Sequence, residues 1–78
     1  MLKVIEVKAN ENYTLDVKLS NGMEGLFDVK PYMDKGVFKQ LKDKGIFKNV
    51  YPQSVGIAWH TGQDLSADTI EYGLLKRH

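Results

Sequence analysis

The residues best suited to chemistry surround one turn near the end of the chain. His60 and Asp64 bracket the turn that follows Trp59, and Asp68 comes four residues later. An imidazole beside a carboxylate can act as a general base or supply two ligands to a metal ion. Catalysis and metal binding both need a third partner nearby, and Asp68 is the only near candidate. Alternatively, His60 is an exposed side chain, Asp64 hydrogen-bonds the turn and Asp68 favours a helix start.

No second group of residues completes a catalytic or cofactor site. The chain has no cysteine, no glycine-rich phosphate loop and no Ser/His/Asp arrangement. His78 is terminal and is not expected to take part. We therefore predict no enzymatic activity, no cofactor and no bound metal. A small hydrolase or metal protein centred on His60, Asp64 and Asp68 is the alternative.

Another set of residues is suited to binding a protein, by apolar area or by position on the turn: Trp59, His60, Asp64, Leu74 and Leu75. Tryptophan is enriched among interface hot spots. However, Trp59 is also in phase with Val55 and Ile57 along an expected strand, which favours a core position. Whether Trp59 belongs to the core or to an interface is left open by the sequence.

A lysine cluster occupies the middle of a chain that is nearly neutral. Eleven basic residues stand against ten acidic ones, for a net charge of +1. The cluster runs from Lys30 to Lys48 and includes Lys35, Lys39, Lys42, Lys44 and Lys48. With Phe38, Phe47 and Tyr51 as stacking platforms, these lysines would suit a nucleic-acid backbone. The alternative is a solvated helix face, which the small net charge favours.

The length predicts a single domain covering residues 1–78. So short a chain has a thin stability margin, and without cysteine it has neither disulfides nor thiolate metal sites. The core or a partner subunit must therefore stabilise it. No apolar run reaches the roughly 7–15 residues of a signal-peptide core or the roughly 18 of a membrane span. We expect a cytoplasmic protein with no membrane contact.

Alternating apolar residues predict three antiparallel strands in the first part of the chain, at residues 3–9, 13–19 and 23–29. In the first strand, Ile5, Val7 and Ala9 share one face. A loop at residues 10–12 pairs Ala9 with Tyr13. A loop at residues 20–22, with Gly22 in the left-handed conformation, pairs Leu19 with Met23 and Leu15 with Phe27, which keeps the apolar residues on one side.

The residue pattern of the second half predicts a helix at about residues 36–43, strands at 46–51 and 55–59, a turn at 52–54, and a final helix. Gly45 is expected to end the first helix. Gly56 and Ala58 offer little bulk, so close packing is expected there. Ser66 has the marks of an N-cap, and the helix is expected to end near Gly73. The order βββαββα predicts an α+β domain, a small antiparallel sheet with two short helices on one face or end.

The residues of the C-terminal half also carry a family resemblance. A strand ending in tryptophan is followed by a glycine turn and a short acidic helix: Trp59, Gly62, Asp64-Leu65, Asp68 and Ile70. The upstream half matches at Phe27-Asp28-Val29, Pro31, Phe38, Leu41, Asp43, Phe47 and Val50. In these residues the chain resembles the small bacterial proteins called domain of unknown function 2442. The resemblance implies a small α+β domain, often beside a second small protein in a toxin–antitoxin-like pair. It implies no catalytic residues, and His60 departs from the small polar or proline residue that is usual there.

These observations favour a non-enzymatic interaction module that binds a protein partner or a second copy of itself. An exposed sheet edge or an apolar patch would provide the contact, because the predicted core is small and the strand edges are open. The alternative is a nucleic-acid-binding accessory protein, acting in autoregulation through the Lys30–Lys48 face.

Overall fold

The computed structural model describes residues 1–76 and contains two small antiparallel sheets, short helices and one core. The elements follow in the order β1 (Val4–Ala9), β2 (Thr14–Leu19), β3 (Glu24–Asp28), 3-10 helices η1 (Lys30–Tyr32) and η2 (Gly36–Lys42), α1 (Lys44–Phe47), β4 (Tyr51–Gln53), β5 (Gly56–Ala58), β6 (Asp64–Ser66), α2 (Ala67–Gly73) and β7 (Leu75–Lys76). The predicted α+β class is confirmed, but the strands divide between two sheets. Sheet A has the strand order β1-β2-β3-β7, and sheet B has the order β4-β5-β6.

The second hairpin of sheet A is the one that the sequence predicts. Leu19 N donates to Met23 O at 2.8 Å, and Leu15 pairs with Phe27. Gly22 has φ +89°, the left-handed conformation that this three-residue loop requires. The apolar residues of β2 and β3 therefore share the face that packs on the core.

The first hairpin differs from the prediction by one residue. Asn10 N donates to Thr14 O, so the loop covers residues 11–13, and Ala9 pairs with Leu15 instead of Tyr13. Tyr13 takes the left-handed position, with φ +63°.

The prediction of which β1 residues face the core is also wrong at the start of the strand. A bulge between Val4 and Glu6 turns Ile5 outward, where it is 53% exposed, and puts Val4 opposite Leu19 in the core. The extra residue of the bulge shifts the alternation by one position.

The central segment contains less regular helix than expected, and the strand expected at residues 46–51 is absent up to residue 50, since β4 begins only at Tyr51. The predicted helix at 36–43 is the 3-10 helix η2, and Gly45 lies inside α1 instead of ending a helix. The Asp43 carboxylate accepts from Gly45 N at 2.8 Å and caps α1, which extends through Ile46 and Phe47. β4 (Tyr51–Gln53) includes Pro52 and Gln53, which were expected in the turn, while Ser54 does lie in a turn.

Sheet B positions the turn after Trp59 and the start of α2. β5 pairs with β4 on one side and with β6 on the other, and a Cβ placed on Gly56 would lie 2.0 Å from Leu65 O. The expected close packing at Gly56 is therefore confirmed. Ser66 ends β6 and caps α2, since its hydroxyl accepts from Thr69 N at 3.1 Å.

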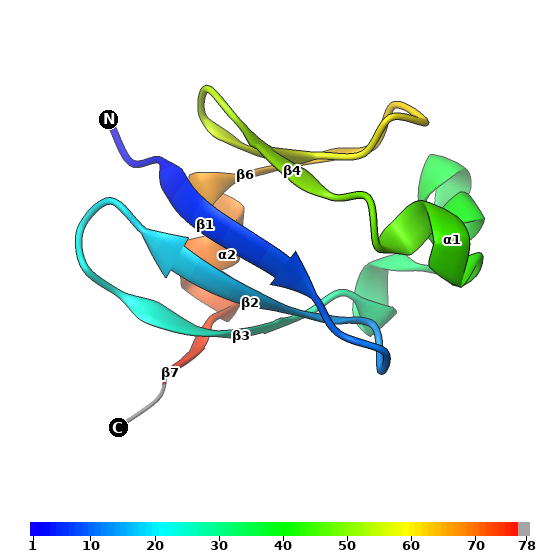
Figure 1. Cartoon of the computed structure of the whole chain (residues 1–78), viewed down its shortest axis with the longest axis horizontal. Helices are drawn as coiled ribbons and strands as arrows, with labels where there is room; N and C mark the ends of the chain where they lie inside the picture. Colours follow the sequence, from blue (N-terminus) through cyan, green and yellow to red (C-terminus); the bar gives the residue numbers. More distant parts are fainter. Residues whose placement is uncertain (77–78) are drawn as a thin grey trace.

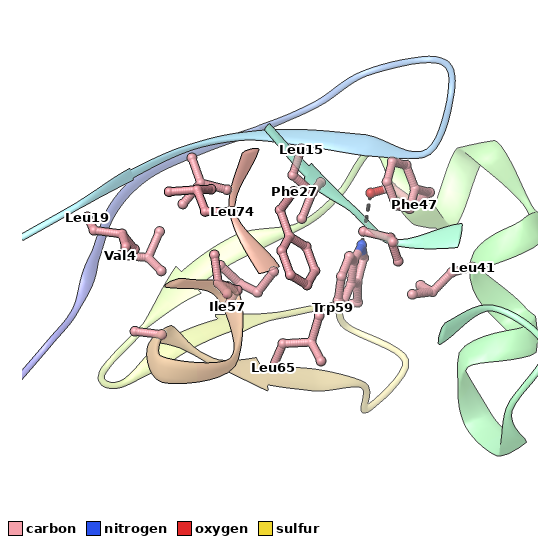
Figure 2. Packing of buried hydrophobic residues seen from close by; sticks show 14 of the residues in the cluster. Val4, Leu15, Leu19, Phe27, Leu41, Phe47, Ile57, Trp59, Leu65 and Leu74 are labelled. Atoms are coloured by element: carbon pink, nitrogen blue, oxygen red, sulfur yellow. Dashed lines mark hydrogen bonds between the residues drawn. The ribbon is translucent and has the colours of Figure 1, made fainter. Parts of the chain in front are cut away.

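Figure 1 shows α2 behind sheet A and sheet B beside β1. The segment formed by η2 and α1, called the helical segment below, lies at one end of both sheets. The buried side chains of all these parts meet in one cluster, and Figure 2 shows Phe27, Ile57 and Trp59 at its centre. Residues 1–76 therefore cover sheet A on one face only. The opposite face, called the outer face below, carries Glu6, Lys8, Asp16, Lys18, Glu24, Leu26 and Leu75.

Candidate functional site

The turn after Trp59 is closed by its own backbone. Trp59 N donates to Gln63 O at 3.0 Å, Gly62 N donates to Trp59 O at 3.1 Å, and Gly62 has φ +103°. The Trp59 side chain is only 1% exposed, and its Nε1 donates to Phe47 O at 2.9 Å (Figure 2). The Trp59 and Phe47 rings stack with their centroids 6.0 Å apart. The structure thus places Trp59 in the core, where it does not provide an exposed anchor.

His60 and Asp64 both lie on the surface of the turn. The His60 ring lies 4.8 Å from the Tyr51 ring, and Asp64 is opposite Ala58 on the neighbouring strand. Asp68 occupies the first turn of α2. Within residues 1–76, no group of three His, Cys, Asp or Glu side chains is arranged to hold a metal ion. His78 lies outside the described residues. Among the described residues, His60, Asp64 and Asp68 are therefore not brought together as a metal site.

Gln63 is the residue of this turn that sequence reasoning missed. It is buried, its Nε2 donates to Val37 O at 2.7 Å and to Gln40 Oε1 at 3.2 Å, and its Oε1 accepts from the Thr61 hydroxyl. The signal was present in the alternation, because Gln63 is two residues before the buried Leu65. A polar side chain in a core-facing position has to find hydrogen-bond partners. Gln63 ties the turn to η2.

The lysine cluster is exposed, but it is partly paired. In a 3-10 helix, residues three apart lie above one another, which places Lys39 and Lys42 on one stripe of η2. Lys42 Nζ lies 2.9 Å from Asp34 Oδ1. This hydrogen bond and the lysine charge lower the pKa of Asp34. Lys44 lies over the Tyr13 ring, 5.7 Å from its centroid.

The aromatic residues expected beside the lysines do not form a stacking platform together. Phe47 is buried and Phe38 is half-buried, and only Tyr51 is exposed. Lys35 and Lys48 are exposed as well. The segment therefore has exposed cations but lacks the row of open rings that single-stranded nucleic acid would stack on.

The two C-terminal leucines have opposite environments. Leu74 is buried in the core, whereas Leu75 is 64% exposed and pairs with Leu26 across β3 and β7. Leu26 is half-buried. The pair lies on the outer face of sheet A, beside the edge strand β7. Of the apolar candidates from the sequence, Leu75 is the one that the structure places on the surface.

The outer face also contains a hollow with a volume of about 430 Å³. It is lined by residues of three adjacent strands: Glu6, Val7, Lys8, Asp16, Val17, Lys18, Glu24 and Gly25. The charged side chains stand on both sides of the row in which Val7, Val17 and Gly25 pair. Sequence reasoning missed this site, because the rows appear only when the register of all three strands is known.

The exposed candidate residues lie on three surfaces: the outer face, the turn after Trp59 and the segment that carries the lysine cluster. No helix within residues 1–76 is long and apolar enough to span a membrane. No curated protein and no solved structure shows a significant match to the chain. The family described as a protein of unknown function, DUF2442, matches residues 4–75. Because this match covers nearly the whole chain, the protein belongs to the DUF2442 family.

Proposed function

We propose that the chain is a non-enzymatic protein-interaction module that binds its partner on the outer face of sheet A. The observation that carries this proposal is the pair formed by the exposed Leu75 and the half-buried Leu26, which lies on the sheet face opposite the core. Apolar side chains grouped on an otherwise charged face are typical of interaction sites. The main chain of β7 lies at the edge of the sheet and is suited to bonding an extended segment of the partner.

The pair would act as the centre of the contact and the surrounding charges as its rim. Desolvated apolar groups supply most of the affinity of such a contact, while rim charges mainly influence association rate and specificity. The partner that the family resemblance suggests is the small protein encoded by the neighbouring gene, in an antitoxin-like pair. Trp59 and Leu74 would contribute indirectly, by fixing the core beneath the sheet.

The test is the solution mass of the chain, measured by light scattering after co-expression with the product of the neighbouring gene. The variants to compare are Leu75→Ser and Val37→Ser. Val37 is a matched control, because it is 61% exposed but lies on η2, away from the outer face. We expect a complex that Leu75→Ser weakens by about tenfold or more and that Val37→Ser leaves unchanged. Absence of any complex, either with the neighbouring protein or between copies of the chain, would contradict the proposal, as would equal binding by both variants.

A second candidate function is nucleic-acid binding by an accessory protein, through the Lys30–Lys48 face. The observation in its favour is that Lys39 and Lys42 share one exposed stripe of η2. If several lysines contact phosphates, the affinity must fall steeply with salt. Binding that does not change between low and physiological salt, or no binding at low salt, would exclude this function.

A further inference from the structure

The charged residues of the outer face form two rows that run across the strands. In the first row Glu6 pairs with Lys18, which pairs with Glu24. In the second row Lys8 pairs with Asp16, which pairs with Leu26. On both β1 and β2, the residue of one row therefore has the opposite charge to the residue of the other row. The hollow described above lies between the rows.

We infer that the partner on this face is a second copy of the same chain, related by a two-fold axis. The inference rests on the part of the proposed function that makes the outer face a protein-binding surface. It takes the protein bound there to be a second copy of the chain. The axis lies in the plane of the face, between the two rows and perpendicular to the strands. Rotation about it places the first row of one copy over the second row of the other. Glu6 then faces Lys8 of the second copy, and Lys18 faces Asp16 of the second copy.

The charge pattern selects this axis over the other in-plane two-fold axis. An axis parallel to the strands through β2 would place Lys18 over Lys18 and Asp16 over Asp16 of the second copy. It would also place Glu6 over Glu24 of the second copy. Like charges in contact oppose binding. The first axis instead pairs opposite charges at four positions and keeps the strands of the two sheets aligned, as in face-to-face sheet packing.

Most of the charges needed for these contacts are exposed. Glu6, Lys8 and Lys18 are exposed, and Asp16 is half-buried on the same face. Leu26 continues the second row and lies over Glu24 of the second copy, while the exposed Leu75 lies beyond it on the edge strand β7. Three strands of this length cover well under the ~800 Å² per partner of a standard interface. The dimer should therefore be weak and sensitive to salt.

The experiment exchanges the two charges of β1 and measures self-association by light scattering or sedimentation. Wild type, Glu6→Lys, Lys8→Glu and the double variant E6K/K8E are compared at about 1 mM chain in about 10 mM salt, where screening is weakest. Lys39→Glu is the control, because it makes the same charge change as Lys8→Glu on a different surface.

We expect each single variant to weaken self-association by about tenfold and the double variant to restore it, because positions 6 and 8 face each other across the axis. Lys39→Glu should have no effect. Within one chain, the double exchange places like charges opposite both Lys18 and Asp16. If the charges serve only to pair neighbouring strands, the double variant should be the least stable one and should not recover association.

A wild-type chain that is monomeric under these conditions, or a double variant that associates no better than the single variants, would overturn the inference. Unfolding curves of each variant show whether the sheet is intact. If a single variant does not fold, the salt dependence of wild-type association decides instead: a dissociation constant that does not rise with salt would overturn it. A monomeric chain that still binds the neighbouring protein through Leu75 would remove this inference and leave the proposed function standing.

Discussion

Trp59 joins the strands of sheet B to the helical segment. Its Nε1 donates to Phe47 O at 2.9 Å, and its ring stacks on the Phe47 ring. A hydrogen bond between buried groups contributes about 1 kcal/mol, and a buried partner left unsatisfied costs about 1–3 kcal/mol. In a chain of 78 residues, whose total stability is expected to be about 4–12 kcal/mol, this residue accounts for a substantial share.

Trp59→Phe should lower the free energy of unfolding by about 3 kcal/mol, because it removes the hydrogen bond and leaves a cavity. Urea denaturation followed by circular dichroism measures the change. Tyr72→Phe is the control, because Tyr72 is 96% exposed and its change should stay within about 0.5 kcal/mol. Equal midpoints for the two variants would show that Trp59 is not part of the core.

Gln63 is buried with both ends of its amide occupied. Gln63→Leu should cost about 1–3 kcal/mol, because it leaves Val37 O without its donor. The same substitution at Gln53, which is exposed on β4, is the matched control and should be nearly neutral. A stable Gln63→Leu variant would mean that the turn does not depend on its tie to η2.

At the scale of elements, the helical segment is stabilised by hydrogen bonds from side chains of other elements. Three side chains from other parts of the chain donate to its main-chain carbonyls: Gln63 to Val37, Tyr13 to Lys42, and Trp59 to Phe47. η2 and α1 are too short to be stable as isolated helices in water. Their conformation therefore depends on these contacts and on the burial of Leu41 and Phe47.

Tyr13→Phe should loosen this segment without affecting sheet A. Loss of one hydrogen bond of about 1 kcal/mol should raise hydrogen exchange of the amides of η2 and α1 by about fivefold to tenfold, while the amides of β2 and β3 keep their rates. Tyr72→Phe is again the control. Faster exchange spread evenly over the whole chain would contradict a local role for Tyr13.

The pair Asp34–Lys42 gives a pH-dependent signal in the same segment. Because the hydrogen bond and charge of Lys42 lower the pKa of Asp34, the stabilisation from this pair is present above the unfolded-state pKa. It is lost as the pH falls through the lowered folded-state pKa. The Asp34 side chain is 84% exposed, so the effect on stability should be small.

Titration of the Asp34 carboxyl carbon by NMR should therefore give a pKa below the ordinary aspartate value, and Lys42→Met should return it toward that value. Lys39→Met should have a smaller effect, because Lys39 acts only through its charge. A pKa that is the same in wild type and Lys42→Met would show that the pair does not form in solution.

The elements also show which features the sequence can predict. The β2–β3 hairpin follows from the phase of the apolar residues and from Gly22, which is suited to the left-handed position. The β1–β2 loop was misplaced because Tyr13 takes that position, which bulky residues rarely do. α1 was missed because Ile46 and Phe47 also suit a strand, and only the tertiary contact of Phe47 decides between the two structures.

The candidate site was less predictable than the fold. Leu75 is identifiable from the sequence as an apolar residue near the end of the last helix, but Leu74 beside it has the same character and is buried. The two charge rows depend on the pairing of three strands, one of which contains a bulge.

At the scale of the whole molecule, the chain places its core on one side of sheet A and leaves the other side to solvent (Figure 1). α2, sheet B and the helical segment all contribute to the core. A small chain gains stability by covering such a face with a partner. A core on one side of sheet A therefore leaves the chain with a small core and also leaves a face for the proposed partner.

The most direct test of this account is an NMR titration of labelled chain, first with increasing concentration of itself and then with the product of the neighbouring gene. We predict that the amide signals that move will belong to the outer face, at Glu6, Lys18, Leu26 and Leu75, while those of Lys39 and Lys42 stay in place. Shifts confined to the lysine stripe of η2, or no shifts with either partner, would contradict the claim that the outer face of sheet A is a protein-binding surface.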